Sequence, residues 1–110
     1  METSYKRPKE IESRTEAINL SNCGTLHYTI GFDPDVKRPI EIRCVIGKGG
    51  VPCNILLDSW AKAMSMLLQS GYPAYKIVSK IKKQFIGVVC TNEKISCVNV
   101  VSERLIKELE

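Results

Sequence analysis

The spacing of apolar residues changes once along this chain. Up to residue 46 apolar and polar residues alternate, most clearly over 26–32 and 40–46. A period of two is typical of half-buried strands, so we predict strands over 14–20, 26–32 and 40–46. Beyond residue 50 the apolar residues recur every three or four positions, which predicts helices instead.

Proline and glycine mark the ends of these predicted helices. The first runs from Pro52 to about Ser70 with Gly71 as its C-terminal cap, the second from Pro73 to Gly87, and the last begins near Cys97. The inward face of the first helix is predicted to comprise Leu56, Trp60, Ala63, Met64 and Leu67, broadened by Leu57, Ala61 and Leu68.

Strands followed by helices indicate an α+β fold. We expect an antiparallel sheet of about three strands, followed by two or three helices packed on one face. At 110 residues the chain is expected to form one domain, over 14–110, after an extended N-terminal arm over 1–13. The apolar inventory is large for the length and partly exceeds what one helix face needs, which is a hint of a homo-oligomer; the residues concerned are Trp60, Met64, Met66, Tyr72 and Tyr75.

The composition says more about where the protein is located in the cell than about what activity it has. The net charge of +4 slightly favours an anionic partner, and no stretch has the length of a membrane helix or of a signal peptide. We therefore expect no membrane partner and a cytoplasmic location. In a reducing compartment, five cysteines indicate metal ligands or free thiols rather than structural disulfides.

Four cysteines lie where the predicted local structure changes. Cys23 precedes a strand, Cys53 opens the first helix, and Cys90 and Cys97 flank a polar segment before the last helix. Helix N-termini favour the thiolate, the form that binds zinc or attacks disulfides. These thiols predict a metal site or a redox centre, and the alternative is that they are small buried residues. Cys44 alternates within a strand and is interpreted as core.

The segment between the last predicted strand and the first helix is rich in glycine. Gly47, Lys48, Gly49 and Gly50, with Asn54 in the following helix, form a predicted ligand-binding set for a phosphate or a carboxylate. The segment lacks the spacings of the known nucleotide-binding loops. Its structural interpretation is that the glycines permit a tight turn and close packing of the helix on the sheet.

Other polar residues give weaker indications. Lys76, Lys80 and Lys83 share one side of the second helix and are interpreted as a solvated face. Binding of nucleic acid is not expected, because no arginine and aromatic platform accompanies them. The single histidine, His27, is assigned no role. No base, nucleophile and orienting group share a suitable spacing, so we predict no catalytic residues and no enzyme.

An ordered series of short matches resembles the TSCPD domain family. It includes the segments 22–30 (NCGTLHYTI), 46–50 (IGKGG) with Cys53, and 67–71 (LLQSG). Members of that family occur near the C-terminus of adenosylcobalamin-dependent ribonucleotide reductases, and as small free-standing bacterial or phage proteins. The resemblance extends from about Arg7 to the end of the chain, and it supplies no catalytic barrel.

The resemblance implies a shared cysteine site. Cys23, Cys53, Cys90 and Cys97 match the recurrent cysteines of the family, and zinc is the cofactor this implies. The motif that names the family reads ISCVN here, over 95–99, so its proline and aspartate are replaced while the cysteine is retained. The last helix thereby loses a preset first turn and a negative charge near its N-terminus.

Three functions follow from these observations. The first is a non-enzymatic binding or adaptor module, organised by a zinc–cysteine site, that engages a protein or a nucleotide-like ligand. The second is a protein, possibly phage-encoded, that binds or sequesters a phosphate-bearing small molecule through Gly47–Gly50 between subunits. The third is a thiol reductant that uses Cys90 and Cys97.

Overall fold

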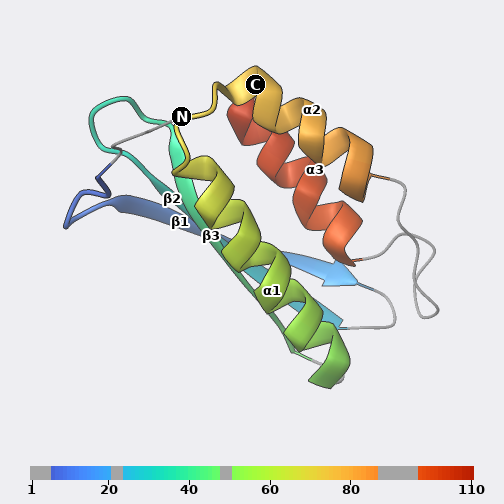
Figure 1. The fold of residues 1–110 in the computed structure, drawn as a ribbon. Helices are drawn as coiled ribbons and strands as arrows, with labels where there is room; N and C mark the ends of the chain where they lie inside the picture. The colour runs from blue at the N-terminus through green and yellow to red at the C-terminus, as the bar shows by residue number, and fades with distance from the viewer. Residues whose placement is uncertain (1–5, 21–23, 48–50, 87–96) are drawn as a thin grey trace.

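A computed structural model describes residues 6–20, 24–47, 51–86 and 97–110, with side chains in the first helix described from residue 54 onward. The described residues form three strands followed by three helices, which confirms the predicted α+β order (Figure 1). The elements are β1 (Glu12–Leu20), β2 (Gly24–Phe32), β3 (Pro39–Ile46), α1 (Val51–Leu68), α2 (Ala74–Phe85) and α3 (Cys97–Leu109). β1 therefore starts inside the segment predicted as an arm.

The sheet is a simple antiparallel meander in the order β1-β2-β3. Tyr28 on the central strand lies opposite Glu16 of β1 and Cys44 of β3. The β2–β3 register is irregular at Gly31 and Phe32, beside a loop in which the Asp33 carboxylate accepts backbone N–H bonds. This connection is wider than a tight hairpin turn.

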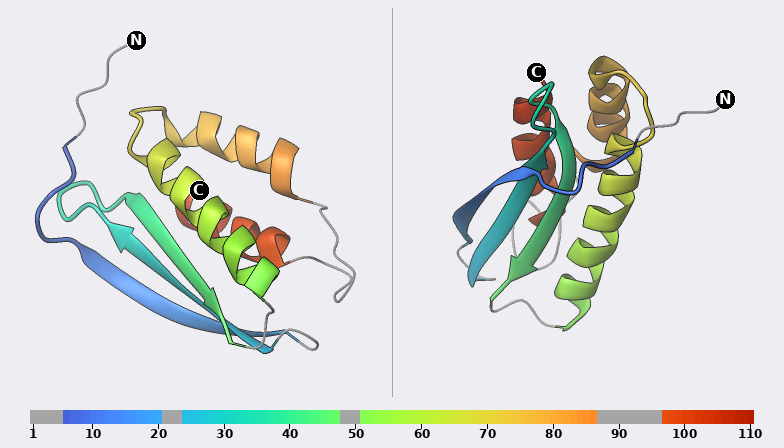
Figure 2. Two further views of the ribbon diagram at one scale, coloured as in Figure 1. Left: turned by 60° about the horizontal axis from the view of Figure 1, so that its bottom comes forward. Right: turned by 90° about the vertical axis from the view of Figure 1, so that its left-hand side faces the viewer.

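All three helices lie on the same side of the sheet (Figures 1 and 2). α1 runs along β3, and α2 packs against α3. Side chains from alternate strand positions fill the space beneath the helices, as the period of two predicts. The largest fully buried apolar side chains, from strands and helices together, are Leu26, Ile30, Ile40, Ile42, Ile46, Leu57, Ile77, Ile81, Val101 and Leu105. None of the helices in the described segments is both long and apolar enough to cross a membrane.

Side chains of α1 also bond to the outer edge of β3. The Asn54 amide accepts the Ile46 N–H at 3.1 Å and donates to the Ile46 carbonyl at 3.1 Å. Ser65 makes the same pair of bonds with Ile42, at 3.0 and 3.2 Å. Gln69 donates to the Ile40 carbonyl at 3.0 Å. These bonds replace the strand that is missing on this side of the sheet.

The buried face of α1 lies within the predicted inward face but is narrower and rotated about the helix axis. Leu57, Trp60, Ala61, Met64 and Leu68 are buried, whereas Leu56 and Ala63 are exposed and Leu67 is only partly buried. The reason is that Asn54, Ser65 and Gln69 follow one side of the helix and must face β3. The buried stripe is therefore the one beside them, although apolar residues are available around more of the circumference.

The C-terminal end of α1 and the start of α2 agree with the sequence, whereas Gly87, the predicted end of the second helix, lies outside the described residues. Gly71 follows α1 with a φ of 90°, a left-handed conformation that glycine adopts without strain. Pro73 precedes α2 as its N-cap residue. Trp60 and Met64 are buried, so only Met66, Tyr72 and Tyr75 of the apolar excess are exposed.

Candidate functional site

Described residues that adjoin the predicted cysteine site lie at one end of the sheet. Leu20, the last residue of β1, pairs with Gly24, and the Gly47 N–H donates to the Thr25 carbonyl at 3.0 Å. The N-terminal turns of α1 and α3 lie at the same end (Figures 1 and 2). The two described elements whose sequences carry one of the four cysteines, α1 with Cys53 and α3 with Cys97, thus both begin at this end.

Two thiols lie close together inside this end of the fold. Cys97, the first residue of α3, is 6% exposed, and Cys44 on β3 is 8% exposed. Burial, and to a smaller extent the negative potential of Cys97 and Asp58, raises the pKa of the Cys44 thiol to about 12. Cys44 is therefore a neutral core thiol at physiological pH, as its place in the strand pattern predicts.

The four-cysteine zinc site remains a prediction. Cys23 and Cys90 lie outside the described residues, as does the side chain of Cys53. Within the described ranges, no group of three or more His, Cys, Asp and Glu side chains is placed to hold a metal. Cys97 fits a ligand role, because the N-terminal end of α3 stabilises a thiolate.

The glycine-rich segment is only partly described. Gly47 is exposed, and a Cβ there would lie 3.6 Å from the Thr25 carbonyl oxygen, an ordinary contact. Packing therefore does not require glycine at this position. Lys48, Gly49 and Gly50 lie outside the described residues. The Asn54 amide is engaged by Ile46, and its role as a ligand-binding residue stays a prediction.

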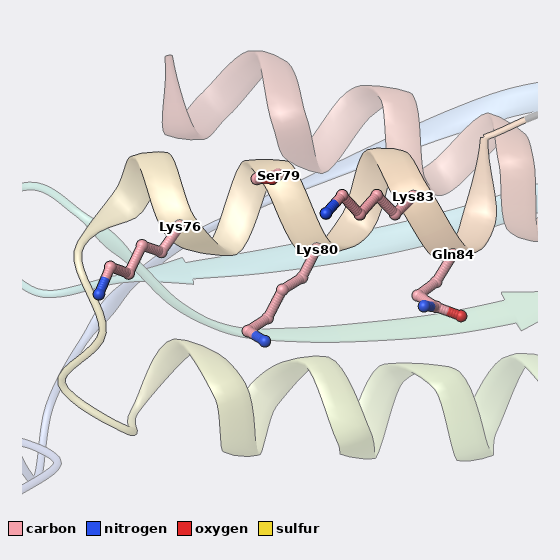
Figure 3. A pocket seen from close by; sticks show the side chains of 5 residues that line it. All are labelled: Lys76, Ser79, Lys80, Lys83 and Gln84. Carbon is pink, nitrogen blue, oxygen red and sulfur yellow. The ribbon is translucent and has the colours of Figure 1, made fainter.

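A basic groove lies on α2. It has a volume of about 380 Å³ and is lined by Lys76, Ser79, Lys80, Lys83 and Gln84, all from this helix (Figure 3). Lys80 and Gln84 extend from α2 on the side of α1. The ammonium, hydroxyl and amide groups together match what a phosphate group binds: positive charge and hydrogen-bond donors.

The lysines of the groove have no acidic partner in the described part of the chain. α2 contains four lysines and no acidic residue, and of these only Lys82 forms an ion pair there, with Glu110 at 3.6 Å. On α1, by contrast, Lys62 pairs with Asp58 at 2.9 Å. Lys80 lies 5.9 Å from the centre of the Tyr72 ring, a cation–π contact that leaves its charge unneutralised.

The comparison with known families agrees with the ordered series of motifs. The TSCPD domain model matches residues 3–109, which is essentially the whole chain. The chain belongs to the TSCPD domain family. No curated protein and no solved structure matches it.

The altered motif of this TSCPD protein has a structural explanation. Val98 and Asn99 occupy the positions of the motif's proline and aspartate, and both side chains are buried at the start of α3. The Asn99 amide donates to the Glu103 carboxylate at 3.1 Å, one helical turn later. An aspartate at position 99 would place a second negative charge against Glu103, so asparagine suits this chain.

Proposed function

We propose that this TSCPD protein is a non-enzymatic binding module for a phosphate-bearing, nucleotide-like ligand. The groove on α2 is the ligand surface in this proposal, and the observation that carries it is the group of lysines without an acidic partner in the described residues. Zinc bound by Cys23, Cys53, Cys90 and Cys97 has a separate, structural role in this proposal, because the described residues that line the groove all belong to α2.

The arrangement of charge on α2 supports an anionic ligand. Lys76 and Lys80 are four residues apart, and Lys80 and Lys83 are three apart, so their ammonium groups repel one another along one helix face. Each such pair destabilises a helix by about 0.2–0.5 kcal/mol, and a bound polyanion offsets this repulsion. The interaction is expected to weaken as salt is added, because the groove is open to solvent.

Replacing two groove lysines is expected to weaken the binding of inorganic triphosphate. A Lys80→Gln, Lys83→Gln double variant should lose about tenfold or more in affinity, about 1.4 kcal/mol, in isothermal titration calorimetry. Glutamine keeps the length and polarity of the side chain and removes only the charge. The matched control is the double variant Lys37→Gln, Lys62→Gln, which removes two lysines that pair with Glu12 and Asp58 and should leave the affinity unchanged.

Two results would contradict this part of the proposal. One is that the unmodified protein binds neither triphosphate nor any nucleotide tested at low salt. The other is that the control variant loses as much affinity as the double variant, because the effect would then come from net charge rather than from the groove.

The zinc site is proposed as a source of folding free energy. A domain of this size buries a modest core, and a bound metal adds stability directly. We expect one zinc ion per chain by elemental analysis of purified protein, and loss of zinc when Cys97 is replaced by serine. A folded protein that contains no zinc would exclude this role and would leave the groove unaffected.

The burial of Cys97 weighs against the thiol reductant. Exchange with a disulfide on another protein requires an accessible thiolate, and Cys97 is buried at the start of α3. A metal ligand needs no such access. We therefore place the binding module before the reductant, with a protein as the alternative ligand of the module.

A further inference from the structure

The two edge strands of the sheet differ in whether their outward backbone groups are hydrogen-bonded. On β3, side chains of α1 bond to the outward backbone groups of Ile40, Ile42 and Ile46. On β1, none of the described residues bonds to the outward backbone groups of the strand. β1 is nine residues long, and no strand in the described part of the chain lies beyond it, so its edge is open there. An open edge of this length is a template for pairing with another strand.

The register identifies the backbone groups on that open edge. Ile42 and Ile46 direct their N–H and C=O groups toward α1, so the residues between them bond to β2. Alternate residues of β2 bond to β3 and to β1 in turn. The backbone groups of Arg14, Glu16 and Ile18 therefore form hydrogen bonds with β2. Backbone groups of Ser13, Thr15, Ala17 and Asn19 therefore point outward, and all four residues are exposed.

Charge on β1 disfavours the two registers next to the one centred on Thr15. A two-fold axis at Arg14 or at Glu16 places like charges directly opposite each other, which is destabilising. An axis at Thr15 places Arg14 opposite Glu16 of the second copy, and Glu16 opposite its Arg14. Both side chains are partly exposed, at 47% and 40%, so they can reach across.

We propose that this protein forms a two-fold symmetric dimer in which β1 pairs antiparallel with β1 of a second copy, centred on Thr15. Thr15 exchanges backbone hydrogen bonds with its own copy, and Ser13 exchanges them with Ala17 of the second copy. Two sheets of three strands then become one of six, with the helices of both copies on the same face.

The residues above β1 are compatible with this arrangement. Arg14 is in ion pairs with Glu16 and with Glu108 of α3, and Arg104 of α3 reaches Glu16 at 3.8 Å. Across the two-fold axis these groups form one network in which positive and negative charges are equal in number. A network of this kind opposes slippage to the neighbouring registers, because each shift by one residue at the axis brings like charges together.

Proline at the axis tests the dimer. Thr15→Pro removes an outward N–H that is not used within the chain, so the monomer should stay folded while the dimer dissociates. We expect at least a tenfold rise in the dimer dissociation constant by analytical ultracentrifugation, with an unchanged far-ultraviolet circular dichroism spectrum. Thr15→Val, which loses the 2.8 Å hydroxyl contact with Thr29 but keeps the N–H, is the control and should remain dimeric.

Cysteine cross-linking tests the register independently. Residues opposite each other in a hydrogen-bonded antiparallel pair have Cα atoms about 5.5 Å apart, within the range for a disulfide. Thr15→Cys should therefore form a covalent dimer on oxidation. Asn19→Cys should not, because the two copies of Asn19 would lie roughly 26 Å apart along the strands.

A protein that is monomeric in ultracentrifugation at millimolar concentration would overturn the proposal. So would a dimer that Thr15→Pro leaves intact, and cross-linking through Asn19 in place of Thr15 would overturn the register. These outcomes do not depend on phosphate binding, because β1 and the groove on α2 share no residue.

Discussion

Replacing Leu57 by alanine is expected to destabilise the protein by about 2–5 kcal/mol, a large share of the stability of a domain of this size. Leu57 is 0% exposed and belongs to the stripe of α1 that packs over the sheet. Alanine removes its buried methyl groups and leaves a cavity that the neighbouring strands fill only partly. Urea unfolding followed by circular dichroism measures the change.

Leu56→Ala is the matched control on the same helix. Leu56 is 55% exposed, so its truncation should change the free energy of unfolding by no more than about 0.5 kcal/mol. The two substitutions are chemically identical and one residue apart, so helix propensity cancels between them. If Leu56→Ala were the more damaging change, the helix would face the sheet through the stripe centred on Leu56 instead.

This pair of leucines shows what the sequence could and could not predict about the fold. The strands were predictable because a period of two has only two faces, and one of them is polar. On α1 apolar residues surround more of the helix than the sheet covers, so composition leaves several orientations open. The choice depends on Asn54, Ser65 and Gln69 meeting the backbone of β3, which is a contact between distant segments.

The candidate site, too, has features that the sequence could predict and features that it could not. Cysteines at the junctions between elements could be found from the chain itself, because turns and helix starts have local signals. The lysines of α2 were equally visible in the sequence, but a solvated face and a binding groove have the same spacing. What distinguishes them is whether acidic side chains are nearby, and that depends on tertiary contacts such as the one between Lys82 and Glu110.

Replacing Asn54 by alanine is expected to destabilise the protein by about 1–3 kcal/mol, because the N–H and the C=O of Ile46 both lose their partner on the outer edge of β3. Asn54→Asp should also be destabilising at neutral pH, since a carboxylate accepts from the N–H but repels the carbonyl oxygen. Protonation of that aspartate restores a donor, so this variant should regain stability as the pH falls toward 4. Unfolding measured across that pH range, with Asn54→Ala as the pH-insensitive reference, separates the two effects.

The two bonds between the Asn54 amide and the Ile46 backbone cap the outer edge of β3, and their loss should also change how the protein associates. Uncapped backbone groups at Ile46 make β3 a second open edge, and a molecule that pairs through β1 and β3 together can form open chains. Asn54→Ala should therefore form species larger than a dimer as its concentration rises, which light scattering detects. Leu57→Ala is destabilised by a similar or larger amount with its cap intact, so it should not. If both variants form species larger than a dimer, the association comes from general unfolding. If only Asn54→Ala does so, side chains of α1 confine pairing to the β1 edge.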